Sequence, residues 1–203
     1  MNFPNLTRIL EIPFLYLTYR NVVGGKRATA TFLKEYVRPK DQDRILDIGC
    51  GPAEMVEHIS NVEYMGFDSN PAYIDSAKKK YGDRGHFFCE TVDDVTLEKI
   101  GTFDLVIALG ILHHLDDKES LVLLELANKA LKKGGRLITF DGCYIEGQSK
   151  IAQFIISRDR GQFVRTQDGY VNLASKVFSR IEVGLRDDLL RIPYNHVILE
   201  CTK

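Results

Sequence analysis

The sequence predicts an α/β fold in which a mostly parallel sheet is covered by helices on both faces. Two features of the chain support this prediction: short, continuous apolar runs recur along it, and segments with helical spacing separate them. Strands that helices cover on both faces lose the period-two alternation of half-exposed strands, so continuous apolar runs are typical of a parallel core. The alternation of strand and helix indicates βαβ units.

Five apolar runs form the predicted parallel core. These strands are Arg44–Ile48, Glu63–Phe67, Gly85–Cys89, Phe103–Ala108 and Arg136–Phe140. The segments with helical spacing that connect them are Glu54–Ser60, Asn70–Tyr81 and Ser120–Leu131. The second of these helices starts with an asparagine followed by proline, which favours a helix N-terminus. The third is followed by two lysines and two glycines, which favour a helix C-terminus.

The 203 residues are predicted to form one domain, because they suffice for one core and are few for two. Residues 1–40 have helical patterning and are expected to form an N-terminal helical cap. Residues 41–142 hold the five core strands. Residues 143–203 end in two β-rich stretches, Phe178–Val183 and Asn195–Thr202, which are predicted to pair as a closing hairpin.

Composition and charge disfavour several kinds of partner. Lys and Arg total 27 against 28 for Asp and Glu, so no nucleic-acid or anionic-lipid partner is expected. No stretch approaches the roughly 20 apolar residues that span a bilayer, and the apolar run Ile9–Leu17 is interrupted by Glu11 and Pro13. The four cysteines form no C-x-x-C pair. We therefore expect a cytoplasmic protein, and the sequence leaves its oligomeric state open.

A glycine-rich turn after the first strand is the strongest local signal for a ligand. The strand runs into Gly49-Cys50-Gly51, at the edge where open α/β sheets bind nucleotide-like ligands. Asp68 ends the second strand, where a carboxylate can accept hydrogen bonds from both ribose hydroxyls. A dinucleotide fold would share these features. However, Glu54 stands at the third glycine position of that motif and places an anion where a pyrophosphate would bind, which disfavours NAD.

Four motifs follow one another along the chain: D-I-G-C-G-P at 47–52, G-F-D at 66–68, F-D-L-V-I-A-L-G-I-L-H-H-L at 103–115 and L-K-K-G-G-R-L at 131–137. In this order and spacing they resemble class I S-adenosylmethionine-dependent methyltransferases, particularly the small-molecule branch of ubiquinone-biosynthesis and sugar methyltransferases. The resemblance covers roughly residues 40–142. It implies a three-layer Rossmann-like sandwich whose seven-stranded, mostly parallel sheet has its last strand antiparallel.

The resemblance also implies an activity and a cofactor. A methyl group would pass from S-adenosyl-L-methionine to a small-molecule acceptor, with oxygen favoured as the methylated atom, and S-adenosyl-L-homocysteine would be released. Such a displacement mainly requires that the enzyme align the acceptor and exclude water.

The residues that would bind the cofactor follow from the matching motifs. Gly49 and Gly51 would contact the methionine part through their backbone, with Asp47 bracing the loop or the amino group. Asp68 would bind the ribose, and Glu90 would replace the aspartate that usually accepts from the adenine amino group. The full implied set is Asp47, Gly49, Cys50, Gly51, Asp68, Ser69, Glu90, Thr91, Val92, Leu109 and Gly110.

A hydroxyl acceptor would benefit from a general base, and two histidines follow the fourth strand near the expected reaction centre. His113 is the preferred candidate and His114 the second; alternatively, the pair only packs the strand-to-helix turn. Candidate substrate-binding residues are Tyr16, Tyr19, Tyr144 and Arg165. The alternatives for these residues are an aromatic stripe that packs on the domain and an exposed cation.

No metal is expected, because Asp141, followed by Gly142, is a lone carboxylate after the fifth strand and offers too few oxygen ligands. A non-catalytic cofactor-binding subunit or sensor is an alternative, since a cofactor site does not guarantee an acceptor pocket. An NAD-dependent oxidoreductase is a second alternative. Protein or RNA methylation is a third, which the lack of a basic surplus disfavours.

Overall fold

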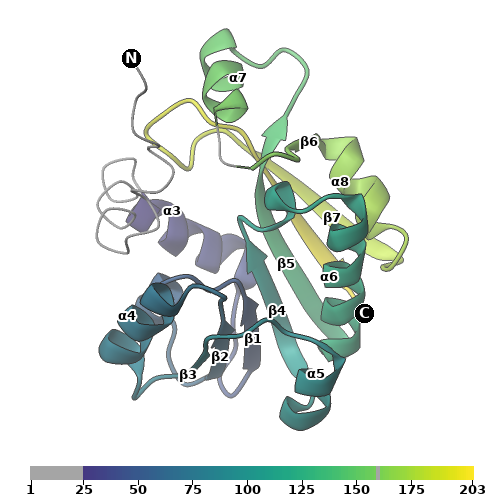
Figure 1. Ribbon diagram of the computed structural model, residues 1–203. Coiled ribbons are helices and arrows are strands. Elements are labelled where there is room, and N and C mark those ends of the chain that lie inside the picture. The colour runs from purple at the N-terminus through teal and green to yellow at the C-terminus, as the bar shows by residue number, and fades with distance from the viewer. Residues whose placement is uncertain (1–24, 159–160) are drawn as a thin grey trace.

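The computed structural model describes residues 25–158 and 161–203, which form one mixed sheet with flanking helices (Figure 1). In chain order the strands are Arg44–Ile48 (β1), Glu63–Phe67 (β2), His86–Phe88 (β3), Phe103–Leu109 (β4), Leu131–Tyr144 (β5), Arg165–Thr166 (β6), Arg180–Arg186 (β7) and His196–Thr202 (β8). Their order across the sheet is β3-β2-β1-β4-β5-β8-β7, and the two-residue β6 pairs with β5 beside this path.

Strand pairing confirms the predicted topology. β1 pairs in parallel with β2 and β4, β2 with β3, and β4 with β5. β8 is antiparallel to both β5 and β7, so the closing hairpin is also confirmed. The sheet therefore has seven main strands, mostly parallel, and the last strand of the chain is the antiparallel one.

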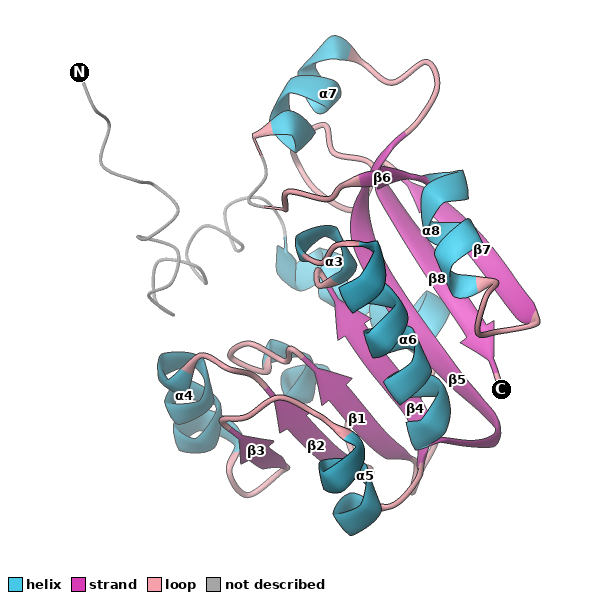
Figure 2. Cartoon of the chain, turned by 45° about the vertical axis from the view of Figure 1, so that its right-hand side comes forward, coloured by secondary structure: helices cyan, strands magenta, loops and turns pink. Residues whose placement is uncertain are grey.

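Helices cover both faces of this sheet. The α-helices are Gly25–Phe32 (α3), Pro71–Tyr81 (α4), Asp94–Ile100 (α5), Asp117–Ala130 (α6), Lys150–Ser157 (α7) and Gln167–Ala174 (α8). Three shorter segments are the π-helix Leu33–Val37 (η1) and the 3-10 helices Glu54–His58 (η2) and Leu112–His114 (η3). In Figure 2, α5, α6 and α8 lie together on the near face of the sheet.

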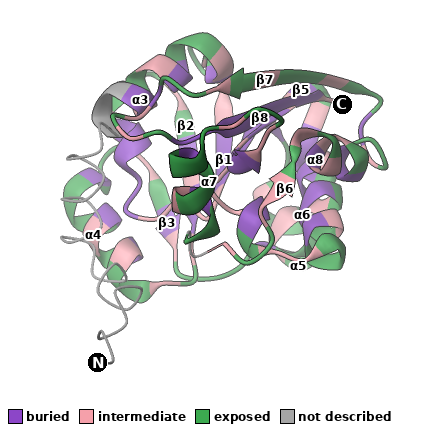
Figure 3. Cartoon of the chain, turned by 90° about the horizontal axis from the view of Figure 1, so that it is seen from above, coloured by how far each residue is buried: buried purple, intermediate pink, exposed green. Residues whose placement is uncertain are grey.

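Two buried apolar clusters, one on each face, hold the three layers together. One cluster joins α6 and α8 to the sheet and includes Leu124 and Val106. The other joins α3, η1, η2 and α4 to the sheet and includes Phe32 and Ile74. Figure 3 shows buried strand residues at the centre and exposed residues on the outer helices, α7 most of all. The predicted three-layer sandwich is therefore confirmed.

Side-chain caps decide where the crossover helices begin. The Asn70 carboxamide oxygen accepts from the Ala72 N–H at 2.9 Å, and Pro71 opens α4, as the sequence predicts. Asp116 and Glu119 form a capping box that starts α6 earlier than its predicted start at Ser120.

Several predicted boundaries differ from the structure. α6 gives way to β5 directly at Leu131, so the lysine and glycine run at 132–135 lies inside a strand, where the pairing with β4 shifts register. The predicted helix Glu54–Ser60 is the shorter 3-10 helix η2, and the third strand spans three residues rather than five. Helix α5 was not predicted; it has seven residues, none of them fully buried, and only Leu97 and Ile100 pack partly buried against the core.

The helical residues before β1 are fastened to the sheet through Arg136 of β5. Its guanidinium donates to the carbonyl oxygens of Tyr36 at 3.1 Å and Val37 at 2.6 Å, and to Glu200 Oε1 at 2.8 Å. Glu200, on β8, also pairs with Arg38. Residues 25–37 are thus helical, as predicted for the N-terminal cap, whereas residues 1–24 lie outside the described part of the chain.

We predict that Arg136→Met lowers the free energy of unfolding by about 1–3 kcal/mol, because it removes the donor of two carbonyl oxygens and one shielded carboxylate. Arg180→Met is the matched control, since Arg180 pairs with Glu182 in an exposed position. Its effect should stay within about 0.5 kcal/mol. Chemical denaturation measures both values, and equal losses would contradict this role of Arg136.

Candidate functional site

The turns that follow β1, β2 and β4 lie side by side at the carboxyl edge of the sheet. These strands are neighbours and run in the same direction, so their ends meet at one edge. The turns comprise residues 49–53, 68–70 and 110–114. Because open α/β sheets bind ligands at this edge, the turns define the candidate site.

Gly49 fixes the path of the first turn. Its φ is +72°, which strains any other residue, and a Cβ built there would lie 2.2 Å from Ile111 Cδ1, so the Ile111 side chain would have to move as well. The Gly49 N–H donates to the Phe67 carbonyl at 2.7 Å, and the Cys50 N–H donates to the same oxygen at 3.0 Å. Gly49 thus joins the turns after β1, β2 and β4.

Gly51 and Asp68 face each other across this edge. Gly51 has φ of +55°, and no heavy atom lies within 4 Å of its Cβ position, so the backbone here is open to an approaching ligand. Its N–H donates to Asp68 Oδ2 at 2.9 Å, while the Asn70 N–H donates to Asp68 Oδ1 at 2.8 Å. Each carboxylate oxygen can accept more than one hydrogen bond, so Asp68 keeps the capacity to accept from two hydroxyls.

Asp47 lies at the base of the glycine turn and is almost completely buried. The Tyr64 hydroxyl of β2 donates to Asp47 Oδ2 at 2.5 Å. Burial raises the pKa of the Asp47 carboxyl to about 7; the Tyr64 hydrogen bond lowers it and the nearby Asp68 charge raises it further. This arrangement favours a cationic group beside Asp47.

The turn after β3 lies next to the end of β2. The Asp68 N–H donates to the Phe88 carbonyl at 3.1 Å, and the rings of Phe67 and Phe88 stack with centroids 4.7 Å apart. Ser69, Glu90 and Thr91 are exposed along this edge. Val92, in contrast, is buried and packs in the apolar core beneath them.

The backbone bends sharply where β4 ends. Leu109 is its last residue, and Gly110 follows with φ of +67° and an N–H that donates to the Phe140 carbonyl at 2.7 Å. A Cβ at Gly110 would lie 3.5 Å from His113 Cε1. The imidazole therefore packs close to the backbone of this bend.

His113 is held by Asp141 of β5. The two residues are 28 positions apart in the sequence, yet His113 Nδ1 lies 2.8 Å from Asp141 Oδ1, and the His113 backbone N–H donates to the same oxygen at 3.2 Å. Both side chains are buried, with exposed fractions of 10% and 0%. Because an ionised carboxylate only accepts, this contact favours the tautomer in which Nδ1 carries the ring proton.

The segment after α7 covers His113. The Phe163 N–H donates to the His113 carbonyl at 2.9 Å, and a Cβ at Gly161 would lie 2.0 Å from His113 Cδ2. His114 is exposed, with its ring centroid 4.2 Å from that of His113. The two histidines thus differ: His113 is enclosed, and His114 lies at the surface.

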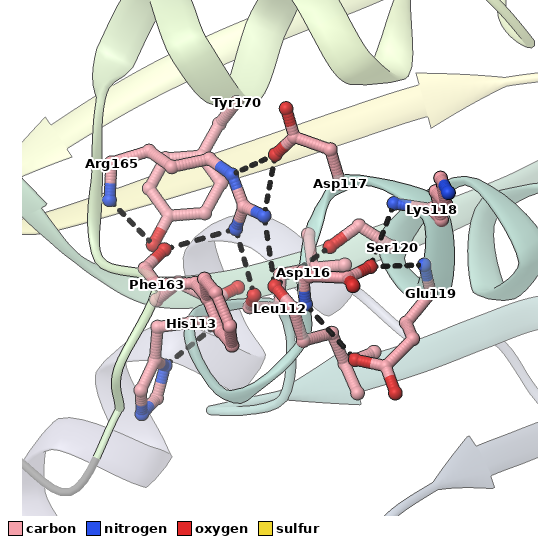
Figure 4. A network of polar contacts seen from close by, with 12 residues as sticks. Leu112, His113, Asp116, Asp117, Lys118, Glu119, Ser120, Phe163, Arg165 and Tyr170 are labelled. Carbon is pink, nitrogen blue, oxygen red and sulfur yellow. Dashed lines mark hydrogen bonds and ion pairs between the residues drawn. The ribbon is translucent and has the colours of Figure 1, made fainter.

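Arg165 fastens this covering segment to η3 and α6 (Figure 4). Its guanidinium donates to the Leu112 carbonyl at 2.9 Å, to the Leu115 carbonyl at 2.8 Å and to Asp117 Oδ1 at 2.8 Å. Its side chain is 11% exposed. These contacts are internal, so the structure assigns Arg165 a role in holding the turn that carries His113, and its contact with substrate stays a prediction.

The remaining predicted residues are spread around the site. Tyr144, at the end of β5, is half-buried beside the short pairing with Thr166 of β6, and Tyr16 and Tyr19 lie outside the described residues. Two contacts in the site were not predicted: that of Tyr64 with Asp47 and that of Asp141 with His113. The sequence places Tyr64 only within a strand, and Asp141 only as an insufficient metal ligand. Neither contact has a local sequence signal, because each joins residues from different strands or turns.

Among residues 25–158 and 161–203, no group of three or more His, Cys, Asp or Glu side chains is arranged to hold a metal ion. In the same ranges, no helix has both the length and the apolar character needed to cross a bilayer.

Comparison with known proteins indicates the family. Residues 46–137 match the methyltransferase domain family. The chain is 29% identical over 153 residues to the eEF1A lysine and N-terminal methyltransferase of Mus musculus, covering 72% of this chain and 21% of that protein. It is 30% identical over 101 residues to the ubiquinone biosynthesis O-methyltransferase of Bradyrhizobium diazoefficiens, covering 47% and 38%. The chain thus spans well under half the length of these two relatives.

The fold is shared with solved methyltransferase structures. A phosphoethanolamine N-methyltransferase 2 of Haemonchus contortus, in complex with phosphomonomethylethanolamine and S-adenosylhomocysteine, superposes with a TM-score of 0.73 at 16% identity. The match covers 98% of this chain and 59% of that one. At this identity the likeness establishes the fold.

The Rossmann-like fold is thus the one that solved methyltransferase structures share, and residues 46–137, just under half of the chain, match the methyltransferase domain family. The cofactor that this resemblance implies is S-adenosyl-L-methionine. The site suits this cofactor: Gly51 leaves open space, Asp68 can accept from hydroxyls, and Asp47 can face a cation.

We predict that Asp68→Asn weakens binding of S-adenosyl-L-homocysteine by about 10- to 100-fold, because hydrogen bonds to a charged acceptor contribute about 1.5–3 kcal/mol. Asp83→Asn, which makes the same change at an exposed position in the turn after α4, is the control and should change affinity little. Calorimetric titration measures both constants, and thermal unfolding checks that the fold is retained. An unchanged dissociation constant for Asp68→Asn would mean that the ribose lies elsewhere.

Proposed function

We propose that this methyltransferase acts on a small-molecule acceptor and methylates an oxygen atom. The observation that carries the proposal is the contact between His113 and Asp141, beside the bend at Gly110. A base held by a buried carboxylate next to the cofactor edge suits an acceptor that must lose a proton.

The proposed role of His113 follows from its hydrogen bonds. In this proposal Asp141 holds the tautomer with the proton on Nδ1, and Nε2 would accept the proton of the acceptor hydroxyl while that oxygen bonds to the methyl carbon and the bond from this carbon to the cofactor sulfur breaks. Asp141 is itself enclosed, which lets it stabilise the imidazolium that results. The alternative, a histidine that only packs the turn, requires no proton transfer.

Other residues in this proposal hold the two reactants. Gly51, Asp68 and Glu90 would bind the cofactor, which supplies an electrophilic methyl group on a sulfonium. Tyr144 would line the acceptor side, near the segment that covers His113. That cover would exclude water from the reacting atoms, as a displacement of this kind requires.

The acceptor class is inferred from charge and from the relatives. The near balance of 27 basic and 28 acidic residues gives no general attraction for nucleic acid, and the ubiquinone relative bears the name of an O-methyltransferase. The mouse relative is named for methylation of a lysine and an N-terminus, which makes a protein acceptor the second candidate. A non-catalytic cofactor-binding subunit is the third. We retain the expectation of a cytoplasmic protein.

An acceptor panel with methyl-labelled S-adenosylmethionine separates these candidates. The panel contains phenols, aliphatic hydroxy compounds and small amines, together with peptides that carry lysine and a free N-terminus. We expect label on a hydroxyl compound. Label on the peptides alone would contradict the proposal in favour of a protein acceptor, and tight cofactor binding without any transfer would favour the non-catalytic subunit.

We predict that His113→Asn lowers kcat for that acceptor by about 10²- to 10⁴-fold, the usual contribution of a general base. The Asn carboxamide can still donate to Asp141, so cofactor affinity should be retained. His114→Asn is the matched control and should keep most of the activity. Equal kcat values for the two variants would show that the histidine pair is structural.

A further inference from the structure

Tyr64 and Asp47 form a buried pair beneath the glycine turn. Tyr64 lies opposite Ile45 in the β1–β2 pairing, so Asp47, two residues further along β1, projects from the same face of the sheet. The Tyr64 ring is 1% exposed, and Asp47 is 3% exposed. Their contact is therefore a buried hydrogen bond between side chains of two neighbouring strands.

Gly66 makes room for this pair. A Cβ at Gly66 would lie 2.8 Å from Cys50 Sγ and 3.1 Å from Tyr64 Cε1, so only glycine lets the tyrosine ring and the turn residue Cys50 pack together. The ring also lies against Phe87, with centroids 5.8 Å apart. Tyr64 is thus confined, and its hydroxyl donates to Asp47 Oδ2.

The groups around Asp47 disfavour its negatively charged form. The titratable groups that face the pair are the Asp68 carboxylate, the Cys50 thiol and, beside Tyr64, the Tyr81 hydroxyl of α4. None of these supplies a positive charge. Burial and the nearby carboxylates also raise the pKa of Cys50, and burial followed by the Asp47 charge raises that of Tyr64, so both stay neutral.

We propose that Tyr64 is a positioning residue for the cofactor, which holds the Asp47 carboxylate ionised and oriented toward the cationic amino group of S-adenosylmethionine. The inference rests on the family's cofactor and not on the acceptor proposed above. The ammonium would supply a positive charge, which none of Asp68, Cys50 and Tyr81 brings to Asp47.

The proposal predicts how cofactor affinity depends on pH. Only ionised Asp47 attracts the ammonium, and its pKa is raised to about 7, so affinity should be high above this pH and fall as the pH drops through it. The Tyr64 hydrogen bond favours the ionised form, so its removal raises the pKa further. In Tyr64→Phe, affinity should therefore begin to fall at a higher pH than in the unaltered protein.

The experiment is calorimetric titration of the full chain with S-adenosyl-L-homocysteine between pH 6 and 8.5. We expect Tyr64→Phe to weaken binding by about 10-fold near pH 7, with a smaller loss at pH 8.5 and a midpoint raised by about one pH unit. Tyr81→Phe removes another largely buried hydroxyl and should leave the profile unchanged. A loss that is equal at every pH, an unshifted midpoint, or no binding by the unaltered protein would each overturn the proposal.

A second variant tests the charge without the cofactor. Asp47→Asn keeps the shape of the side chain and an oxygen that can accept from Tyr64, but it removes the charge. A carboxyl whose folded pKa is raised destabilises the protein as pH rises through that pKa. We therefore expect Asp47→Asn to melt at the same or a higher temperature than the unaltered protein at pH 8, yet to bind S-adenosyl-L-homocysteine at least 10-fold more weakly. Unaltered affinity would show that Asp47 only braces the turn.

Discussion

The site depends on a steric constraint at Gly49. The left-handed backbone at this residue turns the chain away from β1, and the Ile111 side chain packs where a Cβ would lie. The same residue donates to the Phe67 carbonyl, so one glycine contacts the ends of β2 and β4 as well as its own strand. Parallel pairing of β1 with β2 and β4 brings these strand ends to one edge, and the glycine lets the turns pack closely there.

Two enclosed carboxylates, Asp47 and Asp141, lie on either side of this edge, and each has a hydrogen-bonding partner from another element. Asp47 accepts from a tyrosine hydroxyl, which is neutral, and its pKa is raised by burial. Asp141 contacts a histidine, which can itself become cationic. The first pair is therefore suited to receive a cation, and the second to generate one. In our proposals, this difference assigns Asp47 to the cofactor and Asp141 to the acceptor.

The sequence predicted the sheet better than the side-chain contacts. β1 and β2 were placed to the residue, because each is a short apolar run with clear ends. α5 was not predicted, because its seven residues bring only Leu97 and Ile100 against the core, which is too short a pattern to show helical periodicity. The turn glycines and Asp68 were placed at the cofactor edge because their spacing is carried by local motifs.

The contacts of Tyr64, Asp141 and Arg165 were beyond the reach of sequence patterns for a physical reason. Tyr64 meets Asp47 only through the register of two strands and the lack of a side chain at Gly66. From the sequence, Arg165 is expected to be an exposed cation. In the structure its guanidinium instead donates to the carbonyl oxygens of Leu112 and Leu115. Such contacts depend on tertiary geometry, and no short segment of a single sequence carries a pattern that predicts them.

The attachment through Arg165 gives the site a modular construction. The cofactor side is built from the first half of the sheet, whereas the cover over His113 comes from the chain after β5 and is anchored to η3 and α6 by one guanidinium and a few backbone bonds. In our proposals the glycine turn binds the methyl donor and the cover borders the acceptor. A lineage that exchanged one acceptor for another would then alter the cover and keep the turn.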